Sequence, residues 1–101
     1  MVGGGIAGIS FALKAAQYGN VALLCKTTLE ESNTSYAQGG VATVMYEPDN
    51  YEKHIEDTLV AGDGHCDKEA VELVVKKARA QIDQLLEWGM DFDKTDDGSK
   101  F

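Results

Sequence analysis

Hydrophobic positions in the first 46 residues predict a helix followed by two short strands. The helix extends from residue 6 to about residue 18, and Gly19-Asn20 can end it because glycine accepts a left-handed conformation. The apolar residues at helical spacing, which can share one face, are Ile6, Ile9, Leu13 and Ala16. Residues 21–25 are a continuous apolar run, typical of a buried parallel strand, and residues 41–46 can form another strand.

Two further helices are expected in the second half. Pro48-Asp49-Asn50 breaks the chain and can cap a helix from residue 51 to about residue 60. Asp67 is a plausible N-cap for the longest helix, which Gly89 ends. The residues of its apolar face are Val71, Val74, Val75, Ala78, Ile82, Leu85 and Leu86. Its other face carries charges, so we interpret it as a scaffold helix without a chemical role.

Charge and cysteine content exclude several functions. The formal net charge of −8 disfavours nucleic acid and anionic membranes as partners, because their phosphates would repel this surface. Residues 1–29 nevertheless contain two lysines and no acid, so an anion can approach this segment. Cys25 and Cys66 form no disulfide framework, and the sequence begins without a signal-peptide pattern. We therefore expect reduced thiols and a cytoplasmic protein.

The first chemical signal is a glycine turn. Gly3-x-Gly5-x-x-Gly8 has the spacing of the dinucleotide fingerprint, with a strand remnant before it and an apolar helix after it. Gly3 permits the tight turn, Gly5 lets the backbone approach a pyrophosphate, and Gly8 lets the helix pack closely. A tight helix-packing turn without a ligand is the alternative. The context favours a dinucleotide-binding α/β fold with a parallel sheet and flanking helices.

The end of the second predicted strand argues against ordinary NAD binding. A carboxylate commonly stands there to hold a ribose hydroxyl, but this chain has Leu24-Cys25-Lys26. Lys26 can face a phosphate or ribose oxygen, or it can be a solvated lysine, and the sequence favours neither. A metal site made of His54, Asp57, His65 and Cys66 is disfavoured, since a turn separates the first pair from the second.

The second signal is the polar loop that follows, with Ser32-x-Thr34 and then Ala37-Gln38-Gly39-Gly40. Together with the glycine turn, this loop resembles the flavoprotein subunits of succinate dehydrogenase and fumarate reductase and their relatives. Three segments are most similar to the L-aspartate oxidase branch: residues 24–26, residues 36–40, and residues 54–67. The dehydrogenases carry a flavin-linked histidine where this chain has Asn33, so the resemblance implies FAD held without a covalent bond.

The resemblance also implies the role of the chain. It implies a Rossmann-like FAD-binding domain, of which residues 1–101 are the N-terminal part, with most of the first strand missing. The implied reaction is oxidation of L-aspartate to iminoaspartate, with oxygen or fumarate as acceptor, in de novo NAD synthesis. The implied FAD-binding residues are Gly3, Gly4, Gly5, Ile6, Ala7, Lys26, Asn33, Thr34, Ser35, Tyr36, Ala37, Gln38, Gly39 and Gly40.

Other functions stay open at this stage. The family's catalytic residues are expected beyond Phe101, so no catalytic residue is assigned, and the segment alone is expected to be inactive. Exposed strand edges predict that it self-associates. The alternatives are another fumarate reductase-like flavoprotein and a non-catalytic nucleotide-binding module.

Overall fold

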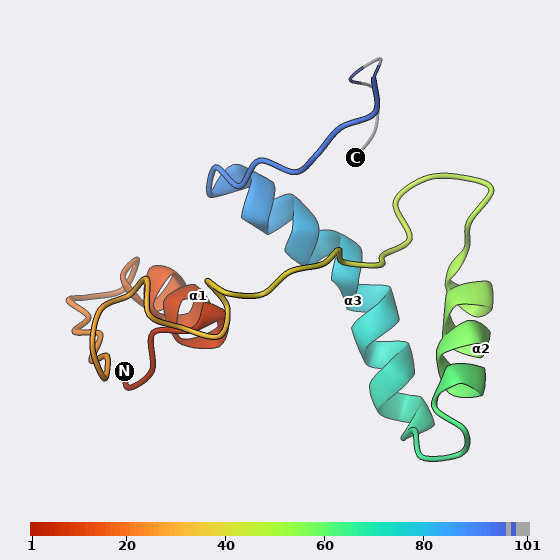
Figure 1. Cartoon of the computed structure of the whole chain (residues 1–101), viewed down its shortest axis with the longest axis horizontal. Helices are drawn as coiled ribbons and strands as arrows, with labels where there is room; N and C mark the ends of the chain where they lie inside the picture. The colour runs from red at the N-terminus through yellow and green to blue at the C-terminus, as the bar shows by residue number, and fades with distance from the viewer. Residues whose placement is uncertain (97, 99–101) are drawn as a thin grey trace. The chain divides into compact units, whose positions relative to one another are not determined.

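The computed structural model describes residues 1–96 and 98. It divides into two compact units, residues 1–40 and residues 41–101. The helices of the described residues are α1 (Ile6–Ala15), α2 (Tyr51–Ala61) and α3 (Lys68–Glu87) (Figure 1). None of them is both long and apolar enough to cross a membrane.

The first unit contains α1 and one short parallel pairing. The Met1 ammonium donates to the Ala22 carbonyl, Leu24 N–H donates to the Met1 carbonyl, and Gly3 N–H donates to the Leu24 carbonyl, each at 2.9 Å. This pairing joins Val2 to Leu24 as an isolated parallel bridge. The strand expected over residues 21–25 is therefore reduced to this single bridge among the described residues.

Helix α1 ends earlier than its apolar pattern predicts. Its C-cap is Ala16, and Tyr18 N–H donates to the Ala15 carbonyl at 2.9 Å in a tighter terminal turn. That turn satisfies a terminal carbonyl of the helix without a left-handed residue, and Gly19 does not have a positive φ. The expected stop at Gly19-Asn20 was therefore wrong in its mechanism and late by three residues.

The second unit is a helical hairpin preceded by an extended segment. Residues 41–46 form no strand with any described residue, so the second expected strand is also wrong. Instead the segment contributes the buried Val44, and its Met45 carbonyl accepts a hydrogen bond from Arg79 Nη1 at 3.1 Å. The Met45 carbonyl is thus paired with a side chain of α3. In a sheet it would accept a backbone N–H from a neighbouring strand.

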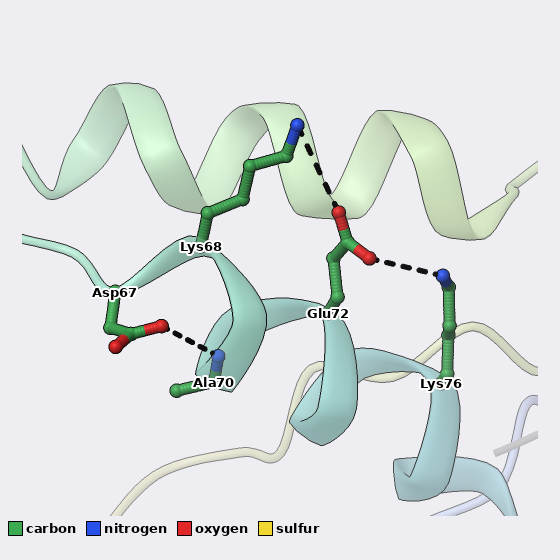
Figure 2. Close-up of polar contacts among 5 residues, drawn as sticks. All are labelled: Asp67, Lys68, Ala70, Glu72 and Lys76. Atoms are coloured by element: carbon green, nitrogen blue, oxygen red, sulfur yellow. Dashed lines mark hydrogen bonds and ion pairs between the residues drawn. The ribbon is translucent and has the colours of Figure 1, made fainter.

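Helices α2 and α3 pack side by side, joined by a short turn (Figure 1). Asn50 caps α2 by accepting the Lys53 N–H at 2.9 Å, and Asp67 caps α3 by accepting the Ala70 N–H at 3.0 Å (Figure 2). Both caps were expected from the sequence. The carboxamide oxygen of Asn50 and the carboxylate oxygen of Asp67 each accept an N–H that the first helical turn leaves unpaired.

The last helix ends as its sequence indicates. Gly89 has a φ of 90°, its N–H donates to the Leu86 carbonyl at 2.9 Å, and Met90 N–H donates to the Leu85 carbonyl at 3.0 Å. This is the Schellman arrangement, in which a left-handed glycine lets two terminal carbonyls find donors. Glycine is required here because a side chain would strain this conformation.

Burial of the expected apolar face of α3 is uneven. Val75 and Ile82 are buried, with 3% and 6% of their surface exposed, whereas Val74 is 66% exposed. The side of α3 next to α2 carries a surface ion-pair chain in which Glu72 accepts from both Lys68 and Lys76, at 3.9 and 3.3 Å (Figure 2). Exposed pairs of this kind contribute little stability, so α3 depends mainly on its few buried contacts.

Candidate functional site: the glycine turn and the loop beside it

The glycine turn has the backbone conformation that its sequence predicts. Gly3 has a φ of 111°, in the region that L-residues rarely adopt, and it leads directly into α1. Any residue with a side chain would be strained there. The role assigned to Gly3, a tight turn out of the paired segment, is therefore confirmed by the geometry of the first unit.

Gly8 brings α1 against the backbone of the turn. A Cβ atom at Gly8 would collide with the Gly3 carbonyl oxygen, and Gly8 is the buried residue of α1. The colliding group is backbone and cannot rotate away. The close helix packing expected of the third fingerprint glycine is thus confirmed.

The middle position of the fingerprint differs from the other two. A Cβ atom at Gly5 would meet only the Thr34 hydroxyl oxygen, at 3.5 Å, which is an ordinary contact. The fold itself therefore does not require glycine at position 5. A group that approaches the backbone of Gly5 would require it, and a cofactor pyrophosphate is such a group.

The start of α1 offers backbone N–H donors to an anion. An α-helix leaves the N–H groups of its first turn without intrahelical partners and carries a partial positive charge at that end. The helix has no acidic residue in its first turn, and Ala7 is exposed there. These features fit a bound diphosphate.

The polar loop reaches the same helix end. The Thr34 hydroxyl oxygen accepts a hydrogen bond from the Ile6 N–H at 3.1 Å, across 28 positions of sequence. Two motifs that the sequence places far apart are therefore joined in the structure. Ile6 was among the residues expected to bind FAD, and in this structure its N–H donates to the Thr34 hydroxyl oxygen.

Hydrogen bonds inside the loop hold it in a compact turn. Ser35 N–H donates to the Ser32 hydroxyl at 3.1 Å, Tyr36 N–H donates to the Ser32 carbonyl at 3.2 Å, and Ala37 N–H donates to the Thr34 carbonyl at 3.3 Å. The Tyr36 hydroxyl donates to Glu31 Oε2 at 2.8 Å. Ser32 was part of the loop motif found in the sequence, but its role as an acceptor inside the loop and the partnership of Glu31 with Tyr36 were not predicted, although a serine three residues before a turn N–H is a recognisable capping signal.

The Tyr36 phenol and the Glu30 carboxyl, both in this region, have shifted pKa values. The hydrogen bond to the Glu31 carboxylate raises the pKa of Tyr36, because it stabilises the neutral phenol. The pKa of Glu30 is lowered by a hydrogen bond from its own backbone N–H and by a second from the Thr28 side chain. A hydrogen bond is the largest cause of each pKa shift.

The remaining expected site residues lie at the surface of the first unit. Lys26 follows the paired Leu24 and is exposed. The other exposed positions are Asn33, Ser35, Tyr36, Ala37, Gln38, Gly39 and Gly40. Gly39 has a φ of 141°, a conformation in which a residue with a side chain would be strained. Gly4 is also near the turn, and a Cβ there would lie 2.6 Å from Cys25 Sγ, a contact that sequence reasoning missed.

The side chains that bind metals are not gathered into a cluster in the part of the chain that the structure describes. Among residues 1–96 and 98, no group of three or more His, Cys, Asp or Glu side chains could hold a metal ion. The Cys66 thiol instead donates to the Thr58 carbonyl at 3.7 Å. The candidate site is the glycine turn together with the loop of residues 32–40, which the Ile6–Thr34 hydrogen bond joins.

Comparison with known proteins agrees with this geometry. The chain is 44% identical over 97 residues to L-aspartate oxidase of Vibrio cholerae and 46% identical over 93 residues to that of Yersinia pestis. It is 42% identical over 98 residues to the chloroplastic L-aspartate oxidase of Oryza sativa. These alignments cover 92–97% of the chain but only 15–18% of each relative.

A solved structure has the same fold over this length. The FrdA chain of E. coli quinol fumarate reductase matches with a TM-score of 0.87 and 35% identity, over 99% of this chain and 18% of that one. The family model described as "FAD binding domain" matches residues 1–101. The chain is thus similar to L-aspartate oxidases and to a fumarate reductase chain over nearly all of its own length, and it belongs to the FAD binding domain family, with FAD as its cofactor.

Proposed function

We propose that this chain is the FAD-binding segment of an enzyme that oxidises L-aspartate to iminoaspartate. The observation that carries the proposal is the pairing of the glycine turn with the Thr34 loop at the start of α1. Identity of 42–46% to three L-aspartate oxidases supports the choice of substrate. In such an enzyme, fumarate or oxygen is the final electron acceptor, and the product enters de novo NAD synthesis.

Bound FAD supplies the acceptor for the hydride that leaves the substrate α-carbon. The residues of this chain hold that cofactor. Gly3, Gly4 and Gly5 provide a turn with little side-chain bulk, and the first-turn N–H groups of α1 beyond that of Ile6 donate to the pyrophosphate. Residues 33–40 follow the cofactor towards the flavin, and Lys26 lies near the adenosine end. No residue of this chain is assigned to proton transfer or to substrate binding.

The parallel sheet is part of the proposal. The Val2–Leu24 bridge has the direction and hydrogen bonding of a parallel ladder, at the place where a Rossmann-like fold has its first two strands. We propose that residues 1–101 form the N-terminal part of such a domain. Free Cys25 and Cys66 favour a reducing compartment such as the cytoplasm, and exposed apolar side chains favour self-association of the segment.

Asn33 supports FAD held without a covalent bond. An amide side chain is not a nucleophile that can attach to the flavin, whereas an imidazole at this position would be. Denaturing the purified full-length protein and passing it through a size-exclusion filter should leave all of the yellow flavin in the filtrate. Flavin retained with the protein would contradict this part of the proposal.

The activity is tested with the full-length, FAD-loaded protein. L-Aspartate, succinate and fumarate are supplied side by side, and iminoaspartate formation and flavin bleaching are followed. Bleaching by L-aspartate with iminoaspartate release supports the proposal. Bleaching by succinate and not by L-aspartate, or reoxidation of chemically reduced flavin by fumarate in a protein that does not react with L-aspartate, would instead favour the second candidate, a fumarate reductase-like enzyme, which the 35% identity to FrdA supports. A folded, colourless protein that binds no FAD would contradict both.

A further inference from the structure

Helix α1 lacks a capping side chain of its own. Its N-cap residue is Gly5, which has no side chain, and its first turn contains no acid. Most helices in this position would begin with Ser, Thr, Asp or Asn, whose side chain accepts an early N–H. In this chain the acceptor comes from elsewhere, since Ile6 N–H donates to the Thr34 hydroxyl at 3.1 Å.

The Thr34 hydroxyl is positioned by its contact with the glycine turn and by hydrogen bonds within its own loop. Its oxygen lies 3.5 Å from the place of a Gly5 Cβ, so it stands directly over the turn. The Thr34 carbonyl accepts the Ala37 N–H, and the adjoining Ser32 hydroxyl accepts the Ser35 N–H. The loop is thus compact by itself, and the Thr34 hydroxyl bonds it to the first residue of α1.

We propose that Thr34 is a positioning residue, which holds the loop of residues 32–40 on the first N–H of α1 and so assembles the two halves of the FAD site. Its contribution to FAD binding passes through the Ile6 N–H and not through a contact with the cofactor. This inference rests on the proposed FAD-binding function. It also means that Ile6 N–H is not a donor to the pyrophosphate.

The first test replaces Thr34 by two residues that differ in one group. Thr34→Val keeps the shape and removes the acceptor, whereas Thr34→Ser keeps the hydroxyl. One lost hydrogen bond corresponds to about a two- to tenfold change in Kd. In the full-length apoprotein, titrated with FAD and followed by flavin fluorescence, we expect T34V to weaken FAD binding by this factor and T34S to leave it near the wild-type value.

The second test removes the donor in place of the acceptor. Proline is tolerated at the first position of a helix, where it lacks only an N–H that the helix does not use. Gly5 already has the extended conformation, with φ −78° and ψ 178°, that a residue before proline prefers. Ile6→Pro should therefore weaken FAD binding about as much as T34V, while Ile6→Ala, which keeps the N–H, controls for the lost side chain.

The double variant T34V/I6P separates positioning from direct contact. If Thr34 acts through Ile6 N–H, the double variant binds FAD within about twofold of either single variant. If Thr34 contacts FAD directly, the two effects multiply, and the inference is overturned. Wild-type affinity in T34V also overturns it.

The outcome is distinguishable from failure of the proposed function. If the wild-type protein binds no FAD, the function fails before any variant is compared. Circular dichroism of each apoprotein identifies a variant that does not fold. In that case Thr34→Ala and the T34A/I6P double variant take the place of T34V, and a multiplied effect again overturns the inference.

Discussion

A methyl group placed on Gly4 would lie 2.6 Å from the Sγ atom of Cys25. The first glycine-rich turn and the end of the following apolar run are therefore packed in contact, with Leu29 Cδ2 also 3.3 Å from the same position. Gly4 is required here by packing, and its φ is not in the left-handed region. This contact links the glycine turn to the segment that precedes the loop of residues 32–40.

Replacing Gly4 by alanine should destabilise the protein, and replacing Cys25 by alanine as well should restore most of the lost stability. Overpacking of this kind costs about 1–3 kcal/mol, because a neighbour must shift. We expect Gly4→Ala to lower the free energy of unfolding by this amount, and Gly4→Ala/Cys25→Ala to recover most of it. Denaturant unfolding of the apoprotein measures both. Gly19→Ala is the control, since no atom lies within 4 Å of its Cβ. Equal losses in the single and double variants would contradict the contact.

Gly8→Ala should be more damaging and should have no such rescue. The atom that a Gly8 Cβ would meet is the Gly3 carbonyl oxygen, which belongs to a turn fixed by the Gly3 conformation. Relief requires moving α1 away from the turn, so the FAD site would separate. We expect Gly8→Ala to abolish measurable FAD binding and to lower the thermal midpoint of the apoprotein more than Gly4→Ala does. A smaller decrease than that of Gly4→Ala would show that α1 can move without cost.

Gly5→Ala should separate the needs of the fold from those of the cofactor. A Cβ at this position makes only an ordinary contact with the Thr34 oxygen, at 3.5 Å, so the apoprotein should keep its stability within about 0.5 kcal/mol. A bound pyrophosphate that approaches the Gly5 backbone would meet the new methyl group. FAD affinity is therefore expected to fall at least tenfold while apoprotein unfolding is unchanged. Unchanged affinity would place the cofactor away from Gly5.

The parts predicted correctly from the sequence are those that local chemistry determines. Asn50, Asp67 and Gly89 act within a few residues of their own helices, so their roles follow from neighbouring positions. The strands expected over residues 21–25 and 41–46 are not formed among the described residues, because strand formation depends on partners elsewhere in the chain. For the first segment only a two-residue partner exists among the described residues.

In the candidate site, too, the features set by neighbouring residues were predicted and those set by distant partners were not. The glycine spacing alone indicated the turn at Gly3 and the close packing at Gly8. The Thr34–Ile6 hydrogen bond and the Gly4–Cys25 packing join positions more than 20 residues apart, and no local pattern encodes them. The resemblance to flavoproteins placed Thr34 at the cofactor, but the structure was needed to reveal its partner.

Titration of Tyr36 should depend on Glu31. The hydrogen bond to the Glu31 carboxylate raises the pKa of Tyr36. A raised pKa in the folded state stabilises the fold below the ordinary pKa of tyrosine, and this contribution is lost as pH rises through the raised value. We expect Glu31→Gln to lower the pKa of Tyr36 towards its ordinary value. Ultraviolet titration of wild-type and Glu31→Gln proteins, each compared with its Tyr36→Phe counterpart, isolates this phenol among the four tyrosines. An unchanged titration would show that the pair does not form in solution.

The cap at Asp67 should be worth more than the ion pairs that follow it on α3. Its carboxylate accepts the Ala70 N–H at 3.0 Å and also faces the positive end of the helix (Figure 2). Loss of such a cap costs about 1 kcal/mol, whereas an exposed ion pair such as Lys76–Glu72 contributes less. Asp67→Ala should therefore lower the free energy of unfolding by about 1 kcal/mol, and Asp67→Asn, which keeps an acceptor, by much less. Asp83→Ala, on the exposed face of the same helix, controls for removing a charge. If Lys76→Ala destabilises the protein more than Asp67→Ala does, the ion-pair chain and not the cap holds the start of α3.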